Sequence, residues 1–127
     1  MFSYIINMKK IYLSGSIRNV GRPAALKLFQ HAEDILSKDY TVYNPMKIHK
    51  PADATWADCM LVDIKYILKD IDSMYMLKNW KSSTGARIEL AIAMEIGLDI
   101  IFEKDAKFDT DSQVKFSKSE INNFVHP

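Results

Sequence analysis

The sequence predicts an α/β domain in three layers, in which helices cover both faces of a parallel sheet of four to five strands, as in Rossmann- and flavodoxin-like folds. Short β-branched and aromatic runs alternate along the chain with longer segments of helical periodicity. Such alternation is typical of parallel sheets with right-handed crossovers. The chain has 127 residues, of which 48% are hydrophobic, and this suffices for a domain with its own core. We therefore expect residues 1–127 to form a single domain.

The elements can be placed in order along the chain. Short apolar runs rich in β-branched or aromatic residues predict strands over residues 10–14, 40–43, 72–77 and 98–102. Helical spacing of apolar residues predicts helices over residues 23–38, 56–69 and 80–97. Pro23 suits a first helical turn, Thr55 is placed to cap the second helix, and Gly97 stands where a helix commonly ends.

The composition and the chain ends exclude several classes of function. A formal net charge of +1 gives no basic field for nucleic acid. The single cysteine fits a reducing cytoplasm, and the histidines have no zinc-type spacing. Residues 1–8 are expected to be an extension too short and mixed for a signal peptide or membrane span, and residues 104–127 a polar tail with a short helix around 119–124. We expect a cytoplasmic protein without metal, cofactor, nucleic-acid or membrane partner.

Two hydroxyl-rich turns are predicted to meet at the carboxyl edge of the sheet, where ligands bind in such folds. The first, GSIRNVGR, offers Gly15 for close backbone approach, the Ser16 hydroxyl, and Arg18 as a forked cation for phosphate. A plain surface turn is the commoner explanation of this loop. The second turn begins the third helix, and at least one of its hydroxyl residues caps that helix; these residues are Ser82, Ser83 and Thr84.

Two carboxylates are predicted on the inward faces of helices. The helical neighbours of Glu89 and Asp63 are small or apolar, so both side chains should face the core. Burying a charge is costly unless it is paired or used, which indicates a paired-acid site with one nucleophile and one acid. The alternative is that each carboxylate caps a loop or pairs with a buried arginine.

Three further side chains admit simpler interpretations. Tyr12 should face the side of its strand opposite to Ile11 and Leu13, and read alone it is a core residue. Cys59 reads as an inert core thiol. Trp80 reads as a packing residue, although it would stand at the mouth of the site and could stack on a base.

The ordered set Tyr12-x-x-Gly-Ser-Ile-Arg, the inward Asp63, and Ser83-x-Gly-x-x-x-Glu89 resembles the nucleoside 2-deoxyribosyltransferase-like superfamily. Within it the motifs are most similar to those of the 2′-deoxynucleoside 5′-phosphate N-hydrolases. The layout also resembles small, often phage-encoded relatives without an assigned function, through Trp56, Cys-Met, Asp and Trp-x-x-Ser-x-Gly-Ala-x-x-Glu in order. The resemblance covers about residues 9–102.

The resemblance implies roles by position. Glu89 would attack the anomeric carbon, Asp63 would protonate the leaving base or hold the sugar, and Tyr12 would orient Glu89 or the sugar ring. The nearby helix N-terminus would help keep Glu89 ionised. The two turns would hold a 5′-phosphate through residues of both motifs, namely Gly15, Ser16, Ile17, Arg18, Ser83 and Gly85. The transferases have an aspartate at the Ser83 position, so serine favours a monophosphate substrate.

The resemblance therefore implies hydrolysis of the N-glycosidic bond of a (deoxy)nucleoside 5′-monophosphate by a homodimer, through a glutamate nucleophile. Three alternatives stay open: base exchange by a nucleoside deoxyribosyltransferase, a non-catalytic protein that binds or sequesters nucleotides, and a structural or interaction domain that retains the fold without nucleotide affinity. Either Asp70 or Asp72 could fill a further strand-edge position. Residues from a neighbouring subunit complete the site in this superfamily, and Ser117 and Ser119 match them only by type.

Overall fold

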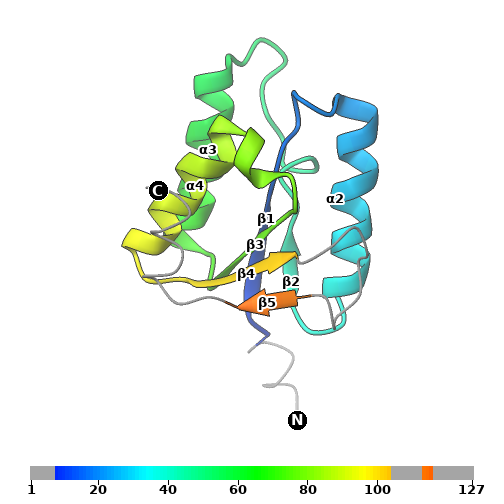
Figure 1. The fold of residues 1–127 in the computed structure, drawn as a ribbon. Helices are drawn as coiled ribbons and strands as arrows, with labels where there is room; N and C mark the ends of the chain where they lie inside the picture. Colours follow the sequence, from blue (N-terminus) through cyan, green and yellow to red (C-terminus); the bar gives the residue numbers. More distant parts are fainter. Residues whose placement is uncertain (1–7, 104–112, 116–127) are drawn as a thin grey trace.

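A five-stranded sheet forms the centre of the computed structural model, which describes residues 8–103 and 113–115 (Figure 1). Its strand order is β2-β1-β3-β4-β5. The first four strands in this order pair in parallel, whereas β5 runs antiparallel to β4. The strands are β1 (Lys10–Ser14), β2 (Thr41–Tyr43), β3 (Ser73–Met76), β4 (Asp99–Glu103) and β5 (Gln113–Lys115). The predicted α/β class and the four parallel strands are confirmed; the fifth strand lies in the expected tail, and its antiparallel direction was not foreseen.

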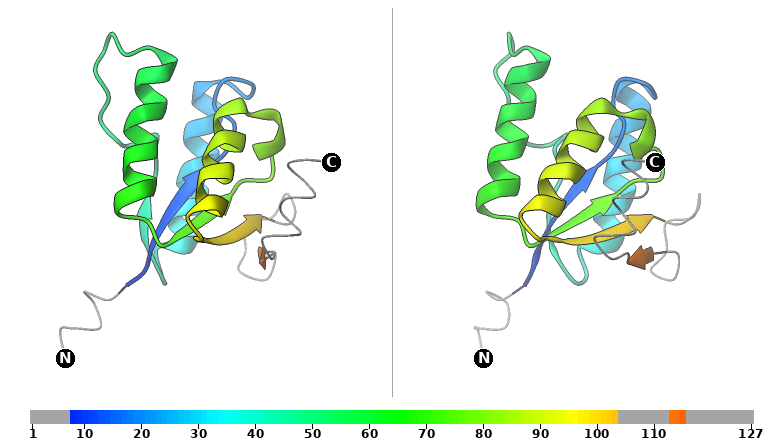
Figure 2. Two further views of the ribbon diagram at one scale, coloured as in Figure 1. Left: turned by 90° about the vertical axis from the view of Figure 1, so that its left-hand side faces the viewer. Right: turned by 60° about the vertical axis from the view of Figure 1, so that its left-hand side comes forward.

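Three α-helices cover the two faces of this sheet (Figures 1 and 2). One face carries α2 alone, and the other carries α3 and α4 side by side. The helices are α2 (Arg22–Leu36), α3 (Trp56–Lys69) and α4 (Thr84–Glu95). The predicted three-layer arrangement is therefore present.

Each face of β1 contributes to a different core. Ile11 and Leu13 pack with Phe29 of α2, whereas Tyr12 packs with Ile67 of α3 and Leu90 of α4. Because side chains alternate along a strand, the residue two places after Tyr12 also faces the α3–α4 layer. The alternation predicted for β1 is thus confirmed, and it aims a tyrosine hydroxyl at α4.

A capping box begins α3 at the expected residue. The Thr55 hydroxyl accepts the backbone N–H of Asp58 at 3.1 Å, and the Asp58 carboxylate accepts the N–H of Thr55 at 3.0 Å. These two bonds satisfy donors that a helix start leaves without intrahelical partners. The box therefore fixes the first turn of the helix that carries Asp63.

The segment predicted as one helix over residues 80–97 is two elements. A 3₁₀ turn, η1 (Trp80–Ser82), comes first, and Ser83 then takes an extended conformation as the N-cap of α4. Its hydroxyl accepts the N–H of Ala86 at 3.1 Å. Gly97 ends the helix with a φ of 81°, as expected. The break turns Trp80 into the core, where it packs on Phe102 at 5.4 Å between ring centroids.

Several expectations fall outside the described residues. These are the extension apart from Met8, most of the tail over residues 104–127, the short helix around residues 119–124, and Ser117 and Ser119. Within residues 8–103 and 113–115, no helix is both long and apolar enough to cross a membrane.

Candidate active site

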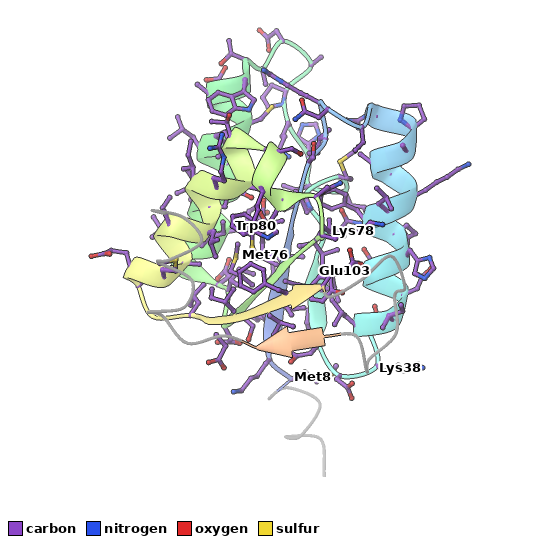
Figure 3. The ribbon with its side chains drawn as sticks, viewed as in Figure 1. Met8, Lys38, Met76, Lys78, Trp80 and Glu103 are labelled. Atoms are coloured by element: carbon purple, nitrogen blue, oxygen red, sulfur yellow. The ribbon has the colours of Figure 1, made fainter. Side chains whose placement is uncertain are left out.

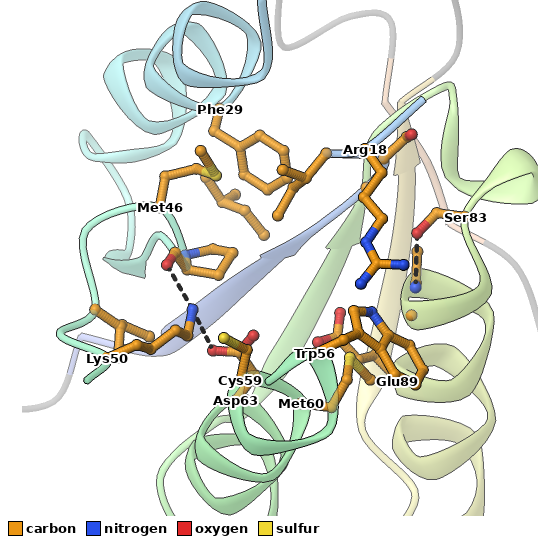
Figure 4. A pocket seen from close by; sticks show the side chains of 18 of the residues that line it. Arg18, Phe29, Met46, Lys50, Trp56, Cys59, Met60, Asp63, Ser83 and Glu89 are labelled. Carbon is orange, nitrogen blue, oxygen red and sulfur yellow. Dashed lines mark hydrogen bonds and ion pairs between the residues drawn. The ribbon is translucent and has the colours of Figure 1, made fainter. Parts of the chain in front are cut away.

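An open pocket of about 900 Å³ lies at the carboxyl end of β1 (Figure 4). Its wall comes from the β1–α2 loop, the loop between β2 and α3, one side of α3, and the first turns of α4. This is the edge of a parallel sheet at which ligands commonly bind. All nine residues predicted for the site line it: Tyr12, Gly15, Ser16, Ile17, Arg18, Asp63, Ser83, Gly85 and Glu89.

Glu89 is a buried carboxyl group in this pocket, held by two hydroxyls of β1. The Tyr12 hydroxyl donates to Oε2 at 3.0 Å, and the Ser14 hydroxyl donates to Oε1 at 2.7 Å. Only 5% of Glu89 is exposed. The predicted inward orientation is confirmed. Ser14 was missed, although it lies two residues after Tyr12 on the same strand and the strand period could have identified it.

Burial decides the ionisation of Glu89. It raises the pKa of Glu89 to about 7, against the lowering effect of the Ser14 and Tyr12 hydrogen bonds, and the negative charge of Asp63 raises it further. Glu89 lies beyond the first turn of α4, where the effect of the helix dipole has fallen off. Burial therefore dominates the ionisation of Glu89, and near neutral pH the group is only partly charged.

Asp63 forms an ion pair that the sequence did not reveal. Its Oδ1 lies 3.1 Å from the Nζ of Lys50, which comes from the loop before α3. Burial raises the pKa of Asp63, while the Lys50 ammonium acts in the opposite direction. The alternative of a paired carboxylate is thus realised for Asp63, with a lysine in place of an arginine. An irregular loop has no periodicity from which the position of Lys50 could be inferred.

Tyr12 donates to Glu89 and lies close enough to Asp63 for the charges of both carboxyl groups to act on its phenol. Burial raises the pKa of Tyr12 well above its usual value, and the carboxylates of Glu89 and Asp63 raise it further. Its phenol therefore stays protonated and remains a hydrogen-bond donor. A neutral donor beside two acids can orient either of them without adding charge.

One end of the pocket is suited to an anion. Arg18 is exposed and lies over the Trp56 ring, 5.6 Å from its centroid. The Ser16 hydroxyl is buried in the pocket wall and has no hydrogen-bond partner within the described part of the chain. Figure 4 shows Ser83 on the same side as Arg18, capping α4. An arginine, an unused hydroxyl and a helix N-terminus together form a potential anion-binding site.

The glycines of the two motifs lie at close contacts between elements, and the contact at Gly15 is the tighter one. A Cβ atom on Gly15 would lie 2.6 Å from Cδ1 of Leu77, and one on Gly85 would lie 3.1 Å from Sδ of Met60. Gly15 therefore lets β1 approach the end of β3, and it also lines the pocket. Gly85 lets α4 approach α3.

The structure also shows which of the tryptophan, cysteine and further aspartate side chains considered from the sequence line the pocket. Trp80 is 5% exposed and does not line the pocket, whereas Trp56 is 41% exposed and does. Cys59 is half-buried in the pocket wall, so it is not a core thiol. Asp70 ends α3, and Asp72 accepts the N–H of Lys10 at 2.9 Å; neither lines the pocket.

A third buried carboxyl group, Glu103, lies outside the pocket at the carboxyl end of β4 (Figure 3). Its Oε1 accepts the backbone N–H of Lys78 at 2.9 Å. Burial raises its pKa to about 7, as for Glu89. Glu103 therefore resembles Glu89 in burial and ionisation but not in access to a ligand.

No group of three or more His, Cys, Asp or Glu side chains able to hold a metal ion occurs among the residues that the structure describes. Comparison with protein families gives a match over residues 9–102 to the model described as a domain of unknown function, DUF4406. No curated protein and no solved structure matches the chain.

Proposed function

The chain belongs to the DUF4406 family, a domain of unknown function, and from its site we propose that it hydrolyses the N-glycosidic bond of a (deoxy)nucleoside 5′-monophosphate. The observation that carries this proposal is the buried Glu89, whose two oxygens are held by Tyr12 and Ser14 in an open pocket beside Asp63. A carboxylate nucleophile next to a second carboxyl group is the arrangement used for retaining glycosyl transfer.

In the proposed reaction an oxygen of ionised Glu89 forms a bond to C1′ of the sugar. The C1′–N bond breaks, its electron pair leaves with the base, and the base receives a proton from Asp63. Water then adds to C1′ and releases Glu89, and the second proton of that water returns to Asp63. The raised pKa of Asp63 supports its role as the acid. If Asp63 instead holds a sugar hydroxyl, its role requires no proton transfer.

The anion-binding end of the pocket supports a phosphorylated substrate. Arg18 offers a forked cation, Ser16 an unused buried hydroxyl, and Ser83 stands at the N-terminus of α4. A phosphate would gain charge-assisted hydrogen bonds from this set. An unphosphorylated nucleoside would leave these donors without an acceptor, so we expect it to react more slowly.

A second candidate is a nucleotide-binding protein without catalysis. The raised pKa of Glu89 and the Lys50–Asp63 ion pair favour it, because a partly neutral carboxyl group is a weaker nucleophile and a carboxylate paired with an ammonium group carries no proton to give to the leaving base. Base exchange, as in a nucleoside deoxyribosyltransferase, needs the same residues and differs only in the acceptor.

We also propose a homodimer and a cytoplasmic location. The support for the dimer is the helical layer of α3 and α4, which exposes large apolar side chains; these are Leu61, Leu68, Ile88 and Ile96. Exposed apolar patches often mark protein–protein contacts. The support for the location is the single cysteine, which remains free.

The test of the function is release of free base from a panel of nucleoside and deoxynucleoside monophosphates, measured by chromatography. We expect base release that rises with protein concentration and that is slower for the matching unphosphorylated nucleosides. Addition of a second base separates hydrolysis from exchange, because only exchange produces a new nucleotide. Nucleotide binding without release of any base would replace the hydrolase with the binding protein.

A further inference from the structure

The pocket has two cationic ends with the two acids between them. Figure 4 shows Arg18 and Ser83 on one side of the pocket, Lys50 and Met46 on the opposite side, and Asp63 and Glu89 between. The proposed function uses the Arg18 end for phosphate and leaves the Lys50 end unassigned.

The connectivity of a nucleotide places the base at the Lys50 end of the pocket, and this step rests on the proposed function. In a nucleoside 5′-monophosphate the sugar lies between the phosphate and the base. With phosphate at Arg18 and C1′ at Glu89, the base must extend toward the wall that contains Asp63 and Lys50. Met46 and Ile48, from the same loop as Lys50, also line the pocket, and their apolar side chains can contact a planar ring.

The Lys50 side chain is held in a fixed position, as expected of a group that binds a ligand. Its Nζ donates to the backbone oxygen of Pro45 at 3.0 Å and lies 3.1 Å from Oδ1 of Asp63. Its side chain is only 19% exposed, so little conformational freedom remains to be lost on binding. An ammonium group has three N–H donors, and the contacts in the described part of the chain account for two of them.

We propose that Lys50 binds the nucleobase, with its remaining N–H donating to a carbonyl oxygen of the ring. The protein then prefers bases that carry such an oxygen to those that lack it. The selectivity arises because the remaining N–H of this half-buried ammonium loses its partner when the oxygen is absent. Asp63 contributes by fixing the position of the ammonium.

The experiment measures dissociation constants by calorimetry in the full-length Glu89→Gln variant, in which turnover is blocked. The probes are deoxyinosine 5′-monophosphate, the purine deoxyriboside 5′-monophosphate that lacks the carbonyl oxygen at C6 and the adjacent N1–H, and deoxyribose 5-phosphate. We expect the first nucleotide to bind about tenfold to a hundredfold more tightly than the second, as for a hydrogen bond to a charged group.

Adding Lys50→Met should reduce this ratio to about one and leave the affinity for deoxyribose 5-phosphate within about twofold. Lys47→Met is the matched control, since Lys47 lies in the same loop but is 54% exposed and paired with Glu33, and it should keep the full ratio. The pair Lys50→Met/Asp63→Asn removes both charges, and it answers the same question if the single variant does not fold.

A ratio that survives Lys50→Met would overturn the base-binding role, and so would an equal loss for deoxyribose 5-phosphate. A ratio that depends on Lys50, together with a wild-type protein that releases no base, would support the base-binding role and overturn the hydrolase. Failure of every nucleotide to bind would overturn both proposals.

Discussion

At the scale of single residues, the pocket depends on how Glu89 is held. Its two oxygens each accept a hydroxyl from β1, while burial keeps its pKa near neutrality. The hydroxyls and the burial act in opposite directions, and burial is the larger effect. Removing one of these hydrogen bonds should therefore change the pKa of Glu89 and the fraction of it that is ionised near neutral pH.

The pH dependence of stability tests this ionisation. The pKa of Glu89 rises from 4.5 to about 7 on folding, so the folded state is favoured below pH 4.5 and loses that advantage as pH rises through 7. The shift corresponds to about 3 kcal/mol. Asp63 and Glu103 have raised pKa values and act in the same direction. We expect the free energy of unfolding to fall between pH 5 and pH 8, and Glu89→Gln to remove about 3 kcal/mol of that fall.

Urea titrations at the two pH values measure this difference. Glu103→Gln is the control for a buried carboxyl outside the pocket, and it should remove a separate part of the pH dependence, which adds to that of Glu89. An unchanged pH dependence in Glu89→Gln would contradict the assignment of a raised pKa to this residue.

The hydroxyls of β1 give a second prediction. Both hydrogen bonds lower the pKa of Glu89, and the Ser14 bond has the larger effect. If ionised Glu89 is the nucleophile, the pH at which base release reaches half of its maximum should rise in Ser14→Ala, and by less in Tyr12→Phe. Ser73→Ala, another buried serine but outside the pocket, should leave the profile unchanged. A profile that Ser14→Ala does not shift would exclude Glu89 as the titrating group.

At the scale of elements, local sequence signals predicted most boundaries. The strand over Lys10–Ser14 and the helix over Trp56–Lys69 have the predicted bounds, because each has a strong pattern and, for α3, a capping residue. The predicted helix over residues 80–97 failed at its start. The hydroxyls that indicated a helix start were correctly recognised, but the residue that caps is Ser83, so Trp80 lies before the helix.

Close approach between elements gives a third prediction. Gly15→Ala should destabilise the fold by about 1–3 kcal/mol, because the added methyl would meet Cβ and Cδ1 of Leu77 at 2.8 and 2.6 Å. Gly85→Ala should cost less, since the nearest atom, Sδ of Met60 at 3.1 Å, belongs to a flexible side chain. Denaturant unfolding of the two variants compares them directly. A Gly15→Ala variant as stable as the wild type would show that the β1–β3 approach does not require glycine.

At the scale of the whole molecule, periodicity predicted which carboxyl groups face inward, and the two loop motifs predicted further residues that line the pocket. The inward positions of Glu89 and Asp63 followed from helical spacing, and both are buried as expected. Lys50 could not be predicted, because a loop residue is positioned by tertiary contacts that leave no pattern in the sequence. The position of Trp80 could not be predicted either, because it depends on the break between η1 and α4, which places this side chain in the core; Trp56 lines the pocket instead.

The proposed dimer gives a fourth prediction. The α3–α4 layer exposes Leu61 by 66% and Leu68 by 55%, so replacing both with glutamate should yield a monomer in sedimentation experiments, whereas the wild type sediments as a dimer. Leu26→Glu is the control, because this leucine is 43% exposed on α2 in the opposite layer. A monomeric wild type, or a dimer that persists in the double variant, would contradict an interface on this face.

The central claim is that Glu89 is the nucleophile of an N-glycosidic bond cleavage, and the rate of base release from nucleoside 5′-monophosphates tests it most directly. Glu89→Gln should lower kcat on the order of a thousandfold or more, while Glu103→Gln, which alters an equally buried carboxyl group away from the pocket, should stay near the wild-type rate. Base release that survives Glu89→Gln, or a wild type that binds nucleotides and releases no base, would contradict the claim.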